Sequence, residues 1–126
     1  FRSLRHILDS AQIHEYQQLI RKIPVSDNVL EYAVGLASKT RPGTPRATKE
    51  ANNYLTWGAG PRASQYLVIG AKARAILSGR FAASVEDVRA LARPVLRHRV
   101  LPNFTAESEG LTSVKLIDNI VERVKV

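Results

Sequence analysis

The sequence predicts an all-α fold: a small bundle of about five helices that is compatible with one very short strand pair. Five segments carry apolar residues at three- and four-residue spacing, and Pro, Gly or polar residues separate them. The 126 residues, 44% hydrophobic and 24% charged, fit one domain with a single modest core. No internal repeat or low-complexity tract is present.

Two helices are predicted in the N-terminal part of the chain. The first begins near Asp9, which has capping-box spacing with Gln12, and Pro24 ends it. Its apolar face is expected to consist of Ile13, Tyr16, Leu19, Ile20 and Ile23. The second begins after Ser26, a good N-cap, and ends at the segment TRPG at 40–43. Its buried stripe is expected to consist of Val29, Leu30, Ala33, Val34 and Ala37.

The third predicted helix is the central one of the bundle. It opens in the segment GAGPRAS at 58–64, where Pro61 suits the first helical position because its missing N–H would have no partner there. Residues 65–78 are apolar on nearly every side, and Gly79 suits the position after the C-cap. The preceding residues 42–59 are expected to form a long, partly exposed loop with a short strand around 54–57.

Two further helices are predicted toward the C-terminus. The segment SVED at 84–87 is expected to cap a fourth, short helix, and Pro94 to stop it. Residues 95–101 are expected to form a buried connection interrupted by charge. The last helix begins near Thr112, and its apolar residues Val114, Ile117, Val121 and Val124 recur at three- and four-residue spacing.

Positive charge is in excess but dispersed. The formal net charge is +8, which is compatible with nucleic acid, phosphate ligands or an acidic partner. No block of five or six basic residues occurs, and charge of this kind is usually a solvated surface. The absence of Cys fits a reducing compartment, and no apolar run approaches the roughly 20 residues of a membrane helix. The start at Phe1 without a secretory signal indicates a cut within a longer protein.

Several kinds of active site are excluded by their missing residues. The pattern Gly58-x-Gly60-x-x-Ala63 matches a dinucleotide-binding fingerprint, but neither a buried strand nor a suitably placed acidic residue accompanies it. No Gly-Lys-Ser/Thr is present, so there is no Walker A loop. His6, His14 and His98 are too scattered to predict a metal site, and none is assigned.

Arg62 is the one residue whose surroundings predict a ligand. Gly58 and Gly60 allow close backbone approach, Pro61 fixes the backbone, and an arginine then stands in the first turn of a helix. A helix N-terminus favours anions, and a guanidinium offers a planar fork of donors. Two interpretations remain equal at this point: Arg62 binds a phosphate, or it pairs with a surface carboxylate.

Four linked motifs resemble the C-terminal lid of MoxR-type AAA+ ATPases. They are GAGPRAS at 58–64, LSGR at 77–80, VEDV at 85–88 and VLRHR at 95–99, and both their order and their spacing match the family. The resemblance extends over roughly residues 10–126. It implies that residues 1–10 are a linker from a missing AAA+ core and that 11–126 are the helical lid.

The resemblance also implies a function. Arg62 would be the sensor 2 arginine, which reaches the γ-phosphate of ATP and acts in catalysis, and Gly58, Gly60 and Pro61 would shape the nucleotide contact. ATP and Mg²⁺ would be bound mainly by the core, so this chain alone would not be catalytic. Gly60 departs from the Ser that the family often has. Arg41 and Arg80 look like family positions and are equally compatible with structural roles.

The implied setting is a bacterial, cytoplasmic, chaperone-like ATPase. Its partners would be the chain's own AAA+ core, further copies in a ring that is commonly a hexamer, and a von Willebrand factor A domain protein. Neither a membrane nor a specific nucleic acid is expected. The resemblance gives no role for Arg97, His98 and Arg99, and the loop at 42–56 looks specific to this chain and is expected near the subunit interface. The alternative is a basic helical nucleic-acid-binding module, which the charge favours only weakly.

Overall fold

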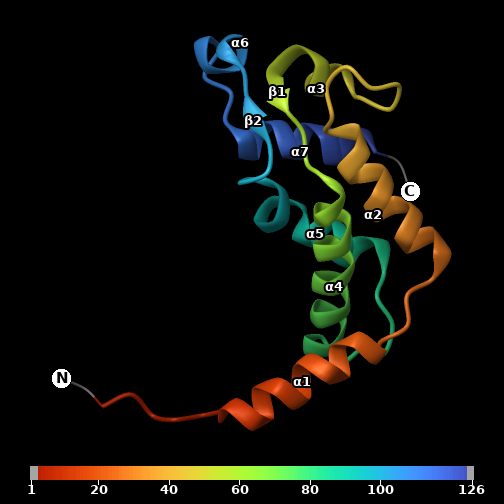
Figure 1. The fold of residues 1–126 in the computed structure, drawn as a ribbon, viewed down its shortest axis with the longest axis vertical. Coiled ribbons are helices and arrows are strands. Elements are labelled where there is room, and N and C mark those ends of the chain that lie inside the picture. Colours follow the sequence, from red (N-terminus) through yellow and green to blue (C-terminus); the bar gives the residue numbers. More distant parts are fainter. Residues whose placement is uncertain (1–2, 125–126) are drawn as a thin grey trace.

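The computed structural model describes residues 3–124 as an arc of helices with α4 in its middle (Figure 1). In chain order the elements are α1 (Ser10–Lys22), α2 (Asp27–Lys39), α3 (Lys49–Tyr54), β1 (Leu55–Trp57), α4 (Pro61–Leu77), α5 (Val85–Leu96), β2 (Leu101–Pro102), α6 (Phe104–Ser108) and α7 (Ser113–Arg123). Helix α4 packs against α2 and α5, and α1 crosses its C-terminal end. The all-α fold and the five expected helices are confirmed, and α3 and α6 are additional.

The hydrophobic core lies where α2, α4, α5 and α7 meet. Leu36, Leu67, Leu96 and Ile117, one from each helix, are at most 1% exposed. The other fully buried residues of α4 are alanines, and such small side chains let neighbouring helices approach closely. Within residues 3–124, no helix has both the length and the hydropathy that crossing a bilayer requires.

The helix ends follow their sequence signals closely. Asp9 and Gln12 form the expected capping box, with Asp9 Oδ1 accepting from the Gln12 N–H at 2.7 Å. Gly79 ends α4 with a positive φ of 73°, and the Arg80 N–H donates to the Ala75 carbonyl at 2.8 Å. Ser26 stands at the N-cap of α2, but its hydroxyl contacts the Asn28 side chain instead of the helix backbone.

The two strands form one short antiparallel pair. Leu55 lies opposite Pro102 and Trp57 opposite Leu101, with an irregularity between the two positions. The Asn103 N–H extends the pairing by donating to the Tyr54 carbonyl at 2.8 Å. The short strand expected around 54–57 is therefore confirmed, and it ends directly before Gly58.

The expected loop at 42–59 is wrong in its second half, where α3 forms. Thr48 caps this helix by accepting from the Ala51 N–H at 3.2 Å, and Ala51 is completely buried. The Asn52 side chain accepts from the Gly43 N–H at 2.8 Å and so fastens α3 to the turn after α2. One cap and one buried alanine hold a helix that is too short to show a periodic apolar pattern.

The expectation that Pro94 stops the fourth helix is also wrong. Helix α5 continues to Leu96, and the Arg97 N–H still donates to the Arg93 carbonyl. Pro94 lies on the exposed side of α5, whereas Val95 and Leu96 are buried. Their burial offsets the hydrogen bond that the proline ring removes. The connection to β2 consequently begins at Arg97.

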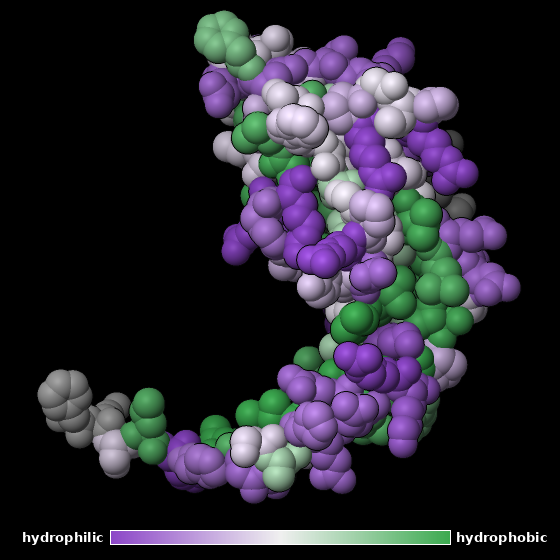
Figure 2. Space-filling model, viewed as in Figure 1, coloured by the Kyte–Doolittle hydropathy of each residue, from purple (hydrophilic) through white to green (hydrophobic). Residues whose placement is uncertain are grey.

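Several residues expected in the core are exposed instead. Leu30 and Val34 of α2 are 39% and 49% exposed, and together with Val68 and Ile69 of α4 they line an apolar groove of about 380 Å³. Helix α1 has no buried residue, although its apolar face is as predicted. Figure 2 shows hydrophobic side chains on α1 and along the junction of α2 and α4.

Candidate functional site

The candidate site is the turn from Gly58 to Arg62, where β1 leads into α4. Gly60 is the N-cap of α4, Pro61 its first residue and Arg62 its second. The structure thus brings the four residues singled out from the sequence into one turn. Pro61 takes the first helical position, where its lack of an N–H costs nothing.

Two side chains at the end of α2 bind the backbone of this turn. Thr40 is completely buried, and its Oγ1 accepts from the Ala59 N–H at 2.9 Å while donating to the Ala37 carbonyl at 2.7 Å. Arg41 Nε donates to the Ala59 carbonyl at 2.7 Å. Both backbone polar groups of Ala59 are therefore bound by two consecutive residues of the neighbouring segment, which fixes the residue before the N-cap.

Gly58 and Gly60 differ in what surrounds them. A Cβ on Gly58 would lie 2.3 Å from the Thr40 carbonyl oxygen and 2.5 Å from the Arg41 Cα, so only glycine permits this approach. A Cβ on Gly60 would meet nothing within 4 Å. The close approach predicted for the two glycines exists at Gly58 alone.

Arg62 is exposed in the first turn of α4. Within residues 3–124, no carboxylate lies within ion-pair distance of its guanidinium. The alternative, in which Arg62 pairs with a surface carboxylate of this chain, therefore finds no support among the described residues. The side chain stands at the positive end of the helix dipole, where an anion is favoured.

Most other arginines from α4 to α7 are paired. The pairs are Arg74 and Arg80 with Asp87, Arg89 with Glu86, Arg93 with Asp118, and Arg123 with Glu50. In the described part of this region, Arg62, Arg97 and Arg99 are the three without a carboxylate partner.

Asp87 is the centre of a structural ion cluster between α4 and α5. Its side chain is fully buried and accepts from Arg80 at 2.7 and 2.5 Å, from Arg74 at 2.6 Å and from the Ser84 N–H at 2.9 Å. The Arg80 guanidinium, with help from Ser84 and Arg74, holds the Asp87 pKa well below its ordinary range despite burial. Arg80 is thus structural, as is Arg41 in its contact with Ala59.

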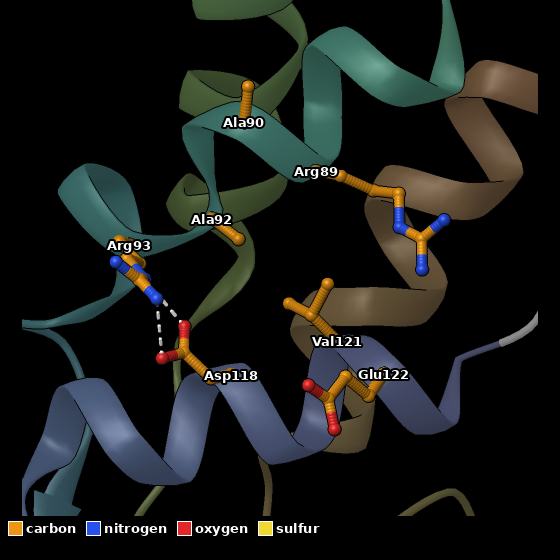
Figure 3. Close-up of a pocket in the computed structure, with 7 residues that line it drawn as sticks. All are labelled: Arg89, Ala90, Ala92, Arg93, Asp118, Val121 and Glu122. Atoms are coloured by element: carbon orange, nitrogen blue, oxygen red, sulfur yellow. Dashed lines mark hydrogen bonds and ion pairs between the residues drawn. The ribbon is translucent and has the colours of Figure 1, made fainter.

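A pocket lined by charged and apolar side chains lies between α5 and α7 (Figure 3). It has a volume of about 400 Å³, and on one side of it Arg93 donates two hydrogen bonds of 2.6 and 2.7 Å to Asp118. The bidentate pair explains why the pKa of Arg93 is raised. Because Arg93 and Asp118 neutralise each other in this ion pair, we interpret the pair as a structural cross-link between α5 and α7.

The histidines do not form part of a cluster of metal-ligating side chains in the described structure. Among residues 3–124, no group of three or more His, Cys, Asp or Glu side chains could hold a metal ion. His98 instead contacts the guanidinium of its neighbour Arg99.

Sequence reasoning missed the role of Thr40 in the site and that of Asp87 between α4 and α5. Thr40 was only the end of a helix in the sequence, because its hydroxyl binds Ala59, 19 positions away, and such a contact leaves no local pattern. Asp87 was expected as a cap, which it is, but its two arginine partners come from distant positions. The presence of Arg74 and Arg80 within 13 residues of Asp87 was the one feature of the sequence that could have indicated these ion pairs.

Comparison with known proteins gives consistent matches. A model of the AAA lid domain family matches residues 47–120. The chain is 23% identical over 120 residues to Chaperone MoxR1 of Mycobacterium tuberculosis, covering 95% of this chain and 32% of that protein. It is 34% identical over 92 residues to Protein MoxR of Paracoccus denitrificans, covering 71% and 27% respectively.

A solved structure is similar in fold and in sequence. It is the crystal structure of a proposed ATPase from Cytophaga hutchinsonii, with a TM-score of 0.83 and 29% identity, and the match covers 91% of this chain and 35% of that one. The chain spans about a third of the length of the curated relatives it matches.

Proposed function

The chain belongs to the AAA lid domain family and is a MoxR-type AAA+ lid, and from this premise we propose that it senses the nucleotide of a chaperone-like ATPase. Arg62 acts as the sensor 2 arginine: it contacts the γ-phosphate of ATP and couples the angle of the lid to the nucleotide state. The observation that supports this most is an exposed arginine with no carboxylate partner among residues 3–124, on a turn whose backbone is fixed by Thr40 and Arg41.

The residues present fit one part of an ATP site. Arg62 supplies a planar cationic donor for phosphate oxygens, and Gly58, Gly60 and Pro61 set where it stands. The described chain gathers no acidic cluster for Mg²⁺. We therefore assign the triphosphate and its Mg²⁺ mainly to an AAA+ core domain, which supplies the hydrolytic chemistry, and expect no hydrolysis by this chain alone.

We extend the proposal to assembly. A lid of this kind works between its own core and neighbouring copies in a ring, commonly a hexamer, and the ring remodels or matures partner proteins, among them one with a von Willebrand factor A domain. The word chaperone in the name of the Mycobacterium relative supports the general role. The half-exposed apolar residues of α1 and of the groove between α2 and α4 offer surfaces for such contacts.

The test is steady-state ATP hydrolysis by the full-length protein with Arg62→Ala and Arg62→Lys. A contact that strengthens as charge moves during hydrolysis lowers turnover more than ATP binding, so we expect about a hundredfold loss in kcat with a small change in KM. Arg62→Lys should not rescue, because an ammonium cannot reproduce a two-pronged contact.

The matched control is Lys115→Ala, which removes the same charge from an exposed position on α7. It should hydrolyse at the parent rate. Circular dichroism on the same samples checks that each variant is folded. A folded Arg62→Ala protein with the parent turnover would remove Arg62 from the nucleotide site.

A further inference from the structure

The segment from Arg97 to Leu101 touches the chain on both sides of the Gly58–Arg62 turn. Before the turn, Leu101 lies opposite Trp57 in the strand pair, one residue ahead of Gly58. After the turn, the Arg99 guanidinium lies over the ring of Tyr66, with 4.9 Å between its central carbon and the ring centroid. The five-residue segment therefore brackets the turn that carries Arg62.

Arg99 is itself held in place for this contact. Its Nη1 donates to the Val95 carbonyl in the last turn of α5 and also contacts the His98 ring. The next residue, Val100, is 6% exposed and anchors the backbone in the core. A guanidinium that is hydrogen-bonded to Val95 and stacked on an aromatic face forms a defined contact between α4 and the segment that follows α5.

The place where Arg99 touches α4 is one helical turn after Arg62. Residues four apart on a helix are neighbours on the same face, so Tyr66 stands beside Arg62. Thr40 and Arg41 fix the chain up to Ala59, but Gly60 adds no side-chain cap to the first turn of α4. A contact at Tyr66 is thus well placed to keep the beginning of α4 from fraying.

We propose that Arg99 is a positioning residue for Arg62. By stacking on Tyr66 it holds the first two turns of α4 in place, and with them the direction in which Arg62 projects. The part of this inference that concerns ATP hydrolysis rests on the function proposed above for Arg62. The part that concerns the stability of the helix start does not.

The first test is hydrogen exchange on the chain of residues 1–126 with Arg99→Gln. Loss of a stacking contact should raise exchange about threefold to tenfold at the amides of 62–66, while the amides of α7 stay unchanged. Tyr66→Leu should have the same effect, and Tyr66→Phe, which keeps the ring, should not. The matched control is Arg97→Gln, since Arg97 is exposed and has no side-chain bond within residues 3–124.

The second test is a double-mutant cycle on kcat in the full-length ATPase. Arg99→Gln should lower kcat about tenfold in the parent, because displacing a catalytic contact slightly costs much of its effect. In the Arg62→Ala background the same substitution should change kcat by less than about twofold, since non-additivity marks residues that act through one another.

The outcomes separate the two proposals. Unchanged exchange at 62–66 in Arg99→Gln overturns the positioning role, whatever Arg62 does. An equal loss of kcat from Arg99→Gln in both backgrounds overturns the claim that Arg99 acts through Arg62. Faster exchange together with an Arg62→Ala protein at the parent turnover supports the stabilising contact and contradicts the proposed function alone.

Discussion

At the scale of single residues, the two glycines of the Gly58–Arg62 turn have opposite surroundings. Gly58 packs its Cα against the Thr40 and Arg41 backbone, while Gly60 faces open space with a φ of −75° and a ψ of 178° that any residue can adopt. A side chain is therefore excluded at one position and tolerated two residues later. The sequence alone, in which the two look alike, predicted close approach at both.

We predict that Gly58→Ala destabilises the chain and Gly60→Ser stabilises it. The new methyl at 58 forces the backbone apart, which costs about 2 kcal/mol. The serine at 60 adds the missing N-cap acceptor and restricts the unfolded chain, which contributes about 0.5 kcal/mol. Urea unfolding of the two variants beside the parent measures both changes. A Gly58→Ala protein as stable as the parent would contradict the packing described for the turn.

Residue-level prediction succeeded where the reason was local. Pro61, Gly79 and the Asp9 capping box depend on neighbours a few positions away, and the structure has each as expected. Thr40 and Tyr66 were not singled out, because their partners, Ala59 and Arg99, are far along the chain. The role of Arg62 itself stays a prediction.

At the scale of elements, the ion cluster around Asp87 joins the end of α4, the turn after it and the start of α5. The Asp87 carboxylate is the only acceptor that Arg80 and Arg74 have in the described ion pairs. Its charge therefore contributes to stability whenever it is present.

We predict a pH dependence of unfolding that belongs to Asp87. Because the folded-state pKa is lowered by Arg80, the carboxylate stabilises the fold fully above the unfolded-state pKa of about 4. This contribution begins to decline as pH falls below that value, and it is lost only as pH passes through the lower folded-state pKa. Asp87→Asn should cost about 2 kcal/mol at pH 7 and about 1 kcal/mol less than that at pH 3. Urea unfolding at the two pH values measures the difference.

The control for this prediction is Asp118→Asn. It breaks the pair with Arg93, whose side chain is 63% exposed, so the expected cost is only about 0.5 kcal/mol. If the parent and Asp87→Asn lost the same free energy of unfolding between pH 7 and pH 3, the buried carboxylate would contribute nothing through its charge.

Whether a helix could be predicted from the sequence depended on the length of that helix. The longer helices show apolar periodicity and were found with nearly the right ends, whereas α3 and α6, with six and five residues, are too short to show a period. Pro94 was wrongly predicted to end α5, because the two residues after it are buried in the core, and such burial depends on the tertiary fold. Leu30 and Val34 were wrongly predicted to be buried, because helical spacing identifies an apolar face but does not show what covers that face.

At the scale of the whole molecule, α4 connects an arm formed by α1 to a body formed by the other helices (Figure 1). Its C-terminal end meets Leu8, Tyr16 and Leu19 around an apolar pocket of about 290 Å³, and its N-terminal end carries Arg62. A rigid helix of this kind can transmit a change at one end to the other. The proposed function uses this arrangement, in which one helix joins the Arg62 turn to α1, and the packing of α1 on α4 emerged from the structure more than from the sequence.

The most direct test of the central claim is hydrogen exchange of the full-length protein in two nucleotide states. With Mg²⁺ and a non-hydrolysable ATP analogue, the peptide that covers 58–66 should exchange more slowly than with Mg²⁺ and ADP, because only the former offers a γ-phosphate to Arg62. The Arg62→Ala protein should lose this difference while still binding both nucleotides. Equal exchange of 58–66 in the two states of the parent protein would contradict the account.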